Sequence, residues 1–475
     1  MFPVRVRAPS LTLYHSLPPF ARHIAASIHG CKLRRWRYGP ETERLVSEAT
    51  ERELWGLEQR ETWQRARLSR VLKLASESVE HYREEWQRRR LEGDLVSPMS
   101  LANWPVLRKE TVRGAPKAFL AAGTPVNRLH AEHTSGTTGT PLRLWQSRES
   151  LRQWYALMET RWRGWYGLSR QDRWAILGGQ MVSPIHQRKP PFWVWNSGLS
   201  QLYLSSYHLS AESCASYLQA LSRWRVVYLW GYASSLFSLA LFARERRLEP
   251  PHLKVVISNA EPLYLHQRAL IGQVFGCPVR DTYGVSEMVC AASECEAGNM
   301  HLWPEAGIYE VLHDERDEPV SAGEIGRLVC TGLLNPDMPL IRYEVGDRVA
   351  VAPPGEQCAC GRTLPILLSV EGRSDDVILT PDGRRIGRLD PVFKCEIPIH
   401  EGQIVQESLS LVRLVVVPGP GFTREHEKSL VSALQQHVGD MQVQLETVKE
   451  IPRSVNGKFR AVISRVKPAQ ALKES

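Results

Sequence analysis

The sequence lacks a short repeat, a dense cysteine framework and a long apolar run free of polar residues, and each absence excludes a class of protein. Without a short period in its 475 residues, the chain is not collagen-like, coiled-coil or low-complexity. Nine cysteines at irregular spacing do not make the disulfide framework of a secreted protein, so we expect a cytoplasmic protein. The most apolar uncharged stretch, residues 226–243, is interrupted by glycine and serine, so no membrane span is expected.

Neither basic nor acidic residues dominate the composition. The chain has 60 basic and 51 acidic residues, a formal charge of +9. Acidic residues are interspersed with the basic ones, and no aromatic stacking motif accompanies the basic clusters, so no nucleic-acid partner is expected. The positive charge favours an anionic substrate such as a nucleotide. With 43% apolar residues, a chain of this length can form two or more domains.

The apolar stretch itself predicts a strand followed by a helix. Residues 226–230 favour a strand, and Gly231 supplies a turn. Ser234 or Ser235 can cap a helix that continues to the charged residues 244–247.

The same unit repeats further along the chain. Residues 255–258 predict a strand, residues 259–262 a turn, residues 264–275 a helix that Gly276 ends, and residues 278–282 the next strand. This alternation indicates an α/β fold with a mostly parallel sheet flanked by helices. Ligand-binding loops in such sheets follow the carboxyl ends of the strands, so these turns should open onto one crevice.

The flanking regions differ in character. Residues 41–95 have helical periodicity and predict a packed helical region without chemistry of its own. Residues 307–349 alternate apolar and polar side chains, as antiparallel strands do. From Ser374 the pattern predicts a β, α, β unit, and about 100 residues can fold alone. We therefore expect two domains, residues 1–373 and 374–475.

The most informative segment is rich in glycine and hydroxyl side chains. Its glycines let backbone N–H groups converge on an anion, and the hydroxyls add donors, which is how a chain cradles phosphates. The segment matches neither the nucleotide-binding loop with Gly-Lys-Ser/Thr nor the dinucleotide Gly-x-Gly-x-x-Gly turn. A flexible surface loop is the alternative. The segment consists of Thr134, Ser135, Gly136, Thr137, Thr138, Gly139 and Thr140, followed by Pro141.

Three further motifs accompany this loop in order: Tyr-Gly-Val-Ser-Glu at 283–287, Arg-Tyr-Glu-Val-Gly-Asp at 342–347, and Pro-Arg-Ser-Val-Asn-Gly-Lys at 452–458. With them, the chain resembles adenylate-forming enzymes of the acyl-CoA synthetase superfamily, and within it the phenylacetate-CoA ligase-like family, including the branch associated with capsular polysaccharide genes. Further segments also resemble the family: residues 13–39, 105–110, 231–236 and 371–376.

The resemblance implies an adenylation domain at residues 1–373 with a β-barrel-like part. It also implies a small mobile α+β lid at residues 374–475 that turns about Ser374 and Asp375. By resemblance, the loop from Thr134 to Thr140 holds the β- and γ-phosphates of ATP, and Tyr283 stacks on the adenine. The other nucleotide-binding residues expected are Ala260, Glu261 and Pro262 across the adenine, Gly284 and Ser286 beside Tyr283, and Asp347 at the ribose hydroxyls.

Three charged residues are expected to serve the reaction. Glu287 would ligate Mg²⁺, since a hard cation prefers carboxylate oxygen. Arg373 would contact the ribose or a phosphate. Lys458 would touch both the substrate carboxylate and the α-phosphate while negative charge shifts between them. The alternatives are an exposed glutamate at a helix start and a solvated lysine.

One residue departs from the family pattern. The phosphate loop of the family often ends Gly-Lys-Pro, and Thr140 stands here in place of the lysine. The loop therefore lacks its own cation. Mg²⁺, Lys458 and Arg143 are left to supply positive charge, and the rate of adenylation is in doubt.

A second group of residues has the chemistry of a metal site. Four N and S ligands would complete a closed tetrahedral zinc site that stabilises the fold, and some family members carry a similar set. Reduced, unpaired cysteines are the alternative. The residues are Cys295, His301, Cys358 and Cys360.

The resulting hypothesis is ATP-dependent activation of a small carboxylic acid, followed by transfer to coenzyme A. Trp174, Trp193, Trp195 and Tyr232 would favour an aromatic or medium apolar acid. Two alternatives are kept: transfer to an amine or hydroxyl acceptor in polysaccharide synthesis, and a noncatalytic nucleotide-binding scaffold. The sequence leaves the acid, the acceptor and a homodimer open.

Overall fold

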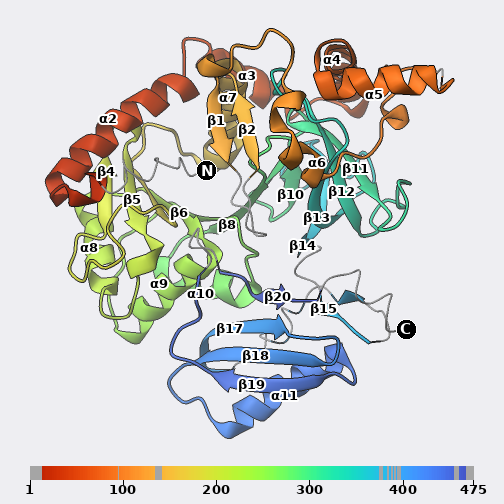
Figure 1. Cartoon of the computed structure of the whole chain (residues 1–475). Coiled ribbons are helices and arrows are strands. Elements are labelled where there is room, and N and C mark those ends of the chain that lie inside the picture. Colours follow the sequence, from red (N-terminus) through yellow and green to blue (C-terminus); the bar gives the residue numbers. More distant parts are fainter. Residues whose placement is uncertain are drawn as a thin grey trace.

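The computed structural model divides into a large N-terminal lobe and a small C-terminal lobe (Figure 1). The large lobe is built on a 12-stranded sheet and the small lobe on a four-stranded sheet. The structure describes residues 13–94, 96–133, 142–373, 378–381, 385–386, 389, 392, 397–453 and 459–466.

The helices cover both ends of the large sheet and one face of the small one (Figure 1). No helix in the described ranges has the length and apolarity needed to cross a bilayer. The α-helices are α2 (Pro19–Arg37), α3 (Thr42–Arg52), α4 (Leu57–Ser78), α5 (Glu80–Leu91), α6 (Lys109–Gly114), α7 (Arg148–Met158), α8 (Cys214–Arg223), α9 (Ala233–Glu245), α10 (Leu265–Phe275) and α11 (Arg424–Val438).

The large sheet has the order β11-β12-β13-β14-β10-β9-β8-β7-β6-β3-β5-β4, and β1 and β2 form a separate hairpin. The strands of this lobe are β1 (His130–His133), β2 (Arg143–Gln146), β3 (Trp174–Gly178), β4 (Trp193–Asn196), β5 (Gln201–Ser205), β6 (Tyr228–Tyr232), β7 (Val255–Asn259), β8 (Val279–Gly284), β9 (Ala291–Glu294), β10 (Met300–Leu302), β11 (Gly307–Leu312), β12 (Gly326–Gly332), β13 (Tyr343–Val351) and β14 (Ile366–Arg373).

The parallel part of the sheet confirms the predicted alternation of strands and helices. Strands β5, β3, β6, β7 and β8 are parallel neighbours. Their buried apolar side chains pack with α9 and α10 in one core, as expected for strands covered on both faces. The boundary of β8 differs from the prediction, because the strand continues through Tyr283 and Gly284 to pair with β9. The serine cap predicted for α9 is also wrong: the N-cap is Tyr232, whose side chain makes no cap hydrogen bond.

The antiparallel strands predicted within residues 307–349 are present as β11, β12 and β13. Strand β13 pairs with β14, and β14 joins β10, so this region continues the large sheet. The pairings of the described strands do not close a barrel, so the barrel-like part stays a prediction.

The predicted helical region at residues 41–95 packs against this antiparallel part. Leu72 and Ala75 of α4, and Tyr82 and Trp86 of α5, are buried in the same core as β12 and β13. The Tyr82 hydroxyl donates to the carbonyl of Pro339 at 3.2 Å. The helices therefore serve as a packed support, as the sequence indicates.

Buried ion pairs tie the first helices to the sheet. The Arg161 side chain is 0% exposed, donates to both carboxylate oxygens of Glu305 at 2.8 Å, and contacts Glu53 at 3.2 Å. Arg52 donates to Glu305 at 2.9 Å. Burial alone would raise the pKa of Glu305, but the two guanidinium groups outweigh burial and lower it. Each buried charge thus has a charged partner, which is the condition for tolerating it.

The small lobe has a core of its own, formed where α11 covers the sheet. Thr423 and His426 form a capping box at the start of α11, and Gly439 follows its last residue. Strand β18 pairs antiparallel to β17 and parallel to β19, and β17 pairs parallel to β20. The strands of this lobe are β15 (Ile378–Leu379), β16 (Arg385–Ile386), β17 (Ile399–Gln406), β18 (Leu411–Pro418), β19 (Gln442–Thr447) and β20 (Val462–Ser464).

Candidate functional site

The site lies at the carboxyl ends of β6, β7 and β8, which end at one edge of the sheet because these strands are parallel neighbours. The turn predicted at Gly231 is wrong, because Gly231 lies within β6, which leads directly into α9. Glycine allows a close approach to β3 there, since a Cβ would lie 2.7 Å from the carbonyl oxygen of Leu177. The small lobe is next to α9 and α10 on this side of the sheet (Figure 1). The predicted crevice is therefore bordered by both lobes.

The loop after β7 contains the residues expected across the adenine. Ala260 is exposed and has a φ of 62°, a left-handed conformation that costs energy for a residue with a Cβ. Pro262 is also exposed. The Glu261 carboxylate is engaged elsewhere: it accepts hydrogen bonds from the backbone N–H groups of Ser234 at 2.9 Å and Phe459 at 2.6 Å. A role at the adenine would thus fall to the backbone of Glu261.

Tyr283 and Asp347 come together although 64 residues separate them. The Tyr283 hydroxyl donates to Oδ2 of Asp347 at 2.7 Å. Burial, with the Asp347 charge second, raises the pKa of Tyr283, so its hydroxyl remains a donor. Asp347 pairs across the sheet with Arg373, for which the structure describes the backbone alone. Three of the predicted nucleotide-binding positions therefore share one corner of the crevice.

Glu287 is 6% exposed and has two strong partners. Its Oε1 accepts from Nζ of Lys109 at 2.9 Å and from the Tyr343 hydroxyl at 2.8 Å. Burial would raise the pKa of Glu287, but the Lys109 charge and the hydrogen bonds outweigh burial and lower it. The exposed helix-start glutamate considered as an alternative is therefore wrong, and the group is an ionised buried carboxylate.

Lys109 had no assigned role in the sequence, although it lies within the family-like segment 105–110. Its partner Glu287 is 178 residues away, so only the fold reveals the pair. Strand pairing explains the contact, because Leu107 forms a bridge with Tyr343 just before α6 begins.

The phosphate-loop residues Thr134 to Thr140 lie outside the described residues, as do the hinge residues Ser374 and Asp375, and Lys458. The neighbours of these segments are described. Strands β1 and β2 bring His133 opposite Arg143 at the ends of the loop. Gln146 of β2 donates to the carbonyl of Ser286 at 3.3 Å. The hairpin of β1 and β2 therefore contacts the motif that contains Glu287 through Gln146.

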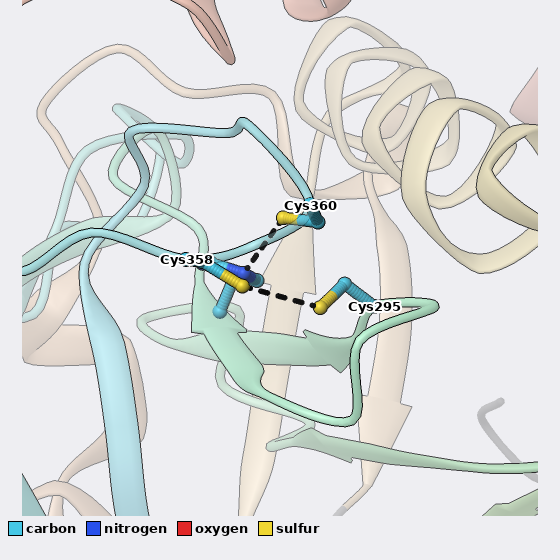
Figure 2. A group of neighbouring side chains, drawn as sticks. Cys295, Cys358 and Cys360 are labelled. Carbon is cyan, nitrogen blue, oxygen red and sulfur yellow. Dashed lines mark hydrogen bonds between the residues drawn. The ribbon is translucent and has the colours of Figure 1, made fainter.

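The predicted metal ligands form a compact cluster (Figure 2). The ligand atoms of Cys295, His301, Cys358 and Cys360 all lie within 4.8 Å of one another. The Sγ atoms of Cys295 and Cys358 are 3.7 Å apart, and Sγ of Cys360 is 3.4 Å from Nε2 of His301. Two thiolates on one tetrahedral zinc, with Zn–S bonds of about 2.3 Å, lie about 3.8 Å apart. The cluster thus fits zinc in number, type and spacing of ligands.

Two further contacts orient this cluster. Nδ1 of His301 lies 3.1 Å from the carbonyl of Leu364, which directs Nε2 towards the thiols. Asn299, which sequence reasoning missed, donates to Sγ of Cys358 at 3.2 Å. The cluster connects β9 and β10 to the loop before β14.

The three tryptophans expected at the acyl pocket lie in the core or at the edge of the sheet instead. Trp174 is 2% exposed and stacks on the ring of Tyr228 within the core. Trp195 stacks on Trp224, with centroids 4.6 Å apart, and Trp193 shares β4 with it at the edge of the sheet. Tyr232 lies at the carboxyl end of β6, the edge of the sheet that carries the site.

Comparisons with known proteins find relatives along the whole chain. A family model for the CapK C-terminal domain matches residues 378–465. Protein CapK of Staphylococcus aureus is 23% identical over 470 residues, covering 96% of this chain and 99% of CapK. A phenylacetate-coenzyme A ligase of Thermus thermophilus is 32% identical over 148 residues, covering 30% of this chain and 33% of that protein.

The fold is shared with solved ligases. The crystal structure of 2-hydroxyisobutyryl-CoA ligase, in the postadenylation state in complex with 2-HIB-AMP, matches with a TM-score of 0.68 and 21% identity. The match covers 89% of this chain and 93% of that one. The chain belongs to the adenylate-forming superfamily, as a member of the phenylacetate-CoA ligase-like family of AMP-forming acyl-CoA ligases.

Proposed function

We propose that this protein activates a carboxylic acid with MgATP and transfers the acyl group to coenzyme A. In the first step, a carboxylate oxygen of the acid attacks the α-phosphorus, the bond to the β-phosphate oxygen breaks, and pyrophosphate leaves. In the second step, the coenzyme A sulfur attacks the acyl carbon and AMP leaves. The observation that supports this proposal most directly is the contact of Tyr283 with Asp347, which joins two of the motifs; the buried Glu287 and the contact of Phe459 with Glu261 add to it.

The nucleotide would lie along this crevice. Tyr283 would stack on the adenine, with Ala260 and Pro262 on its other side. Asp347 would exchange its hydrogen bond from Tyr283 for the ribose hydroxyls, and Arg373, opposite it in the sheet, would reach the ribose or a phosphate. The residues proposed to hold the phosphates are Thr134 to Thr140, with Gly284 and Ser286 beside them.

Glu287 would hold Mg²⁺, which neutralises charge on the phosphates when bound. Its buried, ionised carboxylate suits a hard cation. Lys109 already contacts this carboxylate at 2.9 Å and would bring positive charge beside the loop in which Thr140 replaces the lysine common in the family.

Lys458 is proposed as the catalytic lysine of the first step, and residues 374–475 as a lid that turns about Ser374 and Asp375 between the two steps. Lys458→Ala should reduce acyl-adenylate formation by about 10²- to 10³-fold, because a charge-stabilising donor is lost from the transition state. Thioester formation from a preformed acyl-adenylate should be retained. Lys449→Ala, an exposed lysine of the same lobe, serves as the control and should leave both steps unchanged. Equal losses in both steps would refute this division of labour.

A second acceptor class is supported by the similarity to CapK along almost the whole chain. In this alternative, the acyl-adenylate passes its acyl group to an amine or hydroxyl of a sugar or carrier. Adding coenzyme A, amino sugars or a carrier protein in turn to a preformed acyl-adenylate distinguishes the two. A noncatalytic scaffold would instead bind ATP without using any acid.

We also propose that Cys295, His301, Cys358 and Cys360 hold a structural zinc ion. The ligand spacing supports this, and the site is separate from the crevice residues named above. A closed site with four protein ligands would stabilise the connection between β10 and β14 and take no part in the reaction. Metal analysis of the purified protein tests the proposal, and a zinc content near zero would refute it.

A further inference from the structure

Helix α9 begins without a capping side chain of its own. Its N-cap residue, Tyr232, makes no side-chain cap hydrogen bond, so the first backbone N–H groups need another acceptor. Glu261, from the loop after β7, supplies one: its Oε2 accepts from the N–H of Ser234 at 2.9 Å. A carboxylate is favoured at this end of a helix because the N-terminus carries partial positive charge.

The second oxygen of the same carboxylate contacts the small lobe. Oε1 of Glu261 accepts from the backbone N–H of Phe459 at 2.6 Å. Phe459 directly follows Lys458 in the chain. One carboxylate therefore connects the first turn of a large-lobe helix to the backbone next to the proposed catalytic lysine.

Arg453 and Phe459, which flank residues 454–458 in the sequence, contact each other. The Arg453 guanidinium lies 4.8 Å from the centroid of the Phe459 ring and forms an ion pair with Glu401 of β17. The two ends of the segment are thus in contact with each other, and Arg453 contributes positive charge near Glu261. Burial raises the pKa of Glu261, while the two backbone donors and Arg453 act in the opposite direction.

A cavity of about 540 Å³ opens between α9, α10 and the small lobe, and Ser234, Arg453 and Phe459 line it. Beside it, in the part of the chain that the structure describes, Nε2 of His400 lies 3.1 Å from Glu245. The hydrogen bond from Phe459 to Glu261 therefore joins the two lobes next to open space.

We propose that Glu261 is a positioning residue that latches the small lobe onto α9, through the backbone of Phe459, in the arrangement used for acyl-adenylate formation. The inference rests on the proposed function, in which the catalytic lysine directly precedes Phe459 in the sequence. The latch acts through a backbone group, so it orients the small lobe without touching the substrate. When the small lobe turns for the second step, this hydrogen bond breaks, so the second step does not depend on it.

The kinetic test compares Glu261→Ala, Glu261→Gln and the control Glu245→Gln, which neutralises a carboxylate of α9 at the same interface. Glu261→Ala should lower kcat for acyl-adenylate formation about 10- to 100-fold, as expected for one hydrogen bond to a charged group. Thioester formation from a preformed acyl-adenylate and the KM for ATP should stay within about twofold of wild type. Glu261→Gln, which keeps one acceptor oxygen, should restore part of the loss, and Glu245→Gln should show none. A raised KM for ATP with kcat unchanged would overturn the latch in favour of a direct role at the adenine.

Hydrogen exchange tests the latch without any reaction. In peptides that span residues 452–466, the amide of Phe459 should be protected in the wild type and in Glu245→Gln, and unprotected in Glu261→Ala. Unchanged protection in Glu261→Ala would overturn the proposal. If the wild type activates no acid, the proposed function fails, while the exchange result still decides whether the latch exists.

Discussion

Replacing Glu287 with Gln removes one charge from the centre of the site and changes almost nothing in size. The side chain is 4% exposed, and its partner Lys109 is 22% exposed at 2.9 Å. At that distance and an effective dielectric constant of about 20, the direct attraction is about 6 kcal/mol before desolvation is subtracted. Loss of one partner from a buried pair costs about 3–5 kcal/mol, and the partial exposure of Lys109 places this case near the lower value.

The same substitution should disable the proposed Mg²⁺ site. Acyl-adenylate formation should fall about 10²- to 10³-fold, the effect of losing one charge-stabilising group. The Mg²⁺ concentration that gives half-maximal rate should rise, because a neutral amide is a weaker ligand for a hard cation than a carboxylate. Pyrophosphate exchange measured across a Mg²⁺ titration separates these effects.

Glu110→Gln is the matched control for this prediction, since Glu110 is the neighbour of Lys109 on α6 and its side chain is 74% exposed. It should leave the rate, the Mg²⁺ dependence and the stability unchanged. If Glu287→Gln kept the wild-type rate and the wild-type Mg²⁺ dependence, Glu287 would not be the metal ligand, and its contact with Lys109 would be structural.

Three further predictions concern stability. Cys358→Ser should remove bound zinc, measured by metal analysis, and lower the thermal midpoint, whereas the unrelated Cys31→Ser, an exposed free cysteine, should do neither. Arg161→Leu should destabilise the large lobe by about 3–5 kcal/mol in urea unfolding followed by tryptophan fluorescence, because buried carboxylates lose their partner; no measurable change would contradict the buried network. The pKa values of Glu287 and Glu305 are lowered from 4.5, so their contribution to stability should be complete above that pH and lost as the pH falls further; stability that increased on acidification would contradict these shifts.

Periodicity predicted the parallel sheet because buried strands and their covering helices leave a direct pattern in the sequence. The carboxyl ends of β6, β7 and β8 could be placed on one crevice, since parallel neighbours end at the same edge. Tyr283 contacts Asp347, and Cys295 lies near Cys358, so residues that the family resemblance assigned to one site are neighbours in the structure. Their roles at a nucleotide or a metal stay predictions.

The remaining features depend on contacts between distant segments. Lys109 carries no local sign of its pairing with Glu287, because the contact arises from the pairing of segments far apart in the chain. Glu261 belongs to a motif that suggests the adenine, yet its carboxylate caps α9 and contacts Phe459 of the other lobe. Serine residues near the start of α9 predicted a local cap, and a tertiary contact replaced it.

The most direct test of the proposed chemistry is ATP–pyrophosphate exchange with a panel of aryl, fatty and amino acids. The proposal predicts that at least one acid supports exchange in the wild type, and that Lys458→Ala loses this exchange while it still binds ATP. Binding of ATP without exchange for any acid in the panel would contradict the assignment of this site to acid activation.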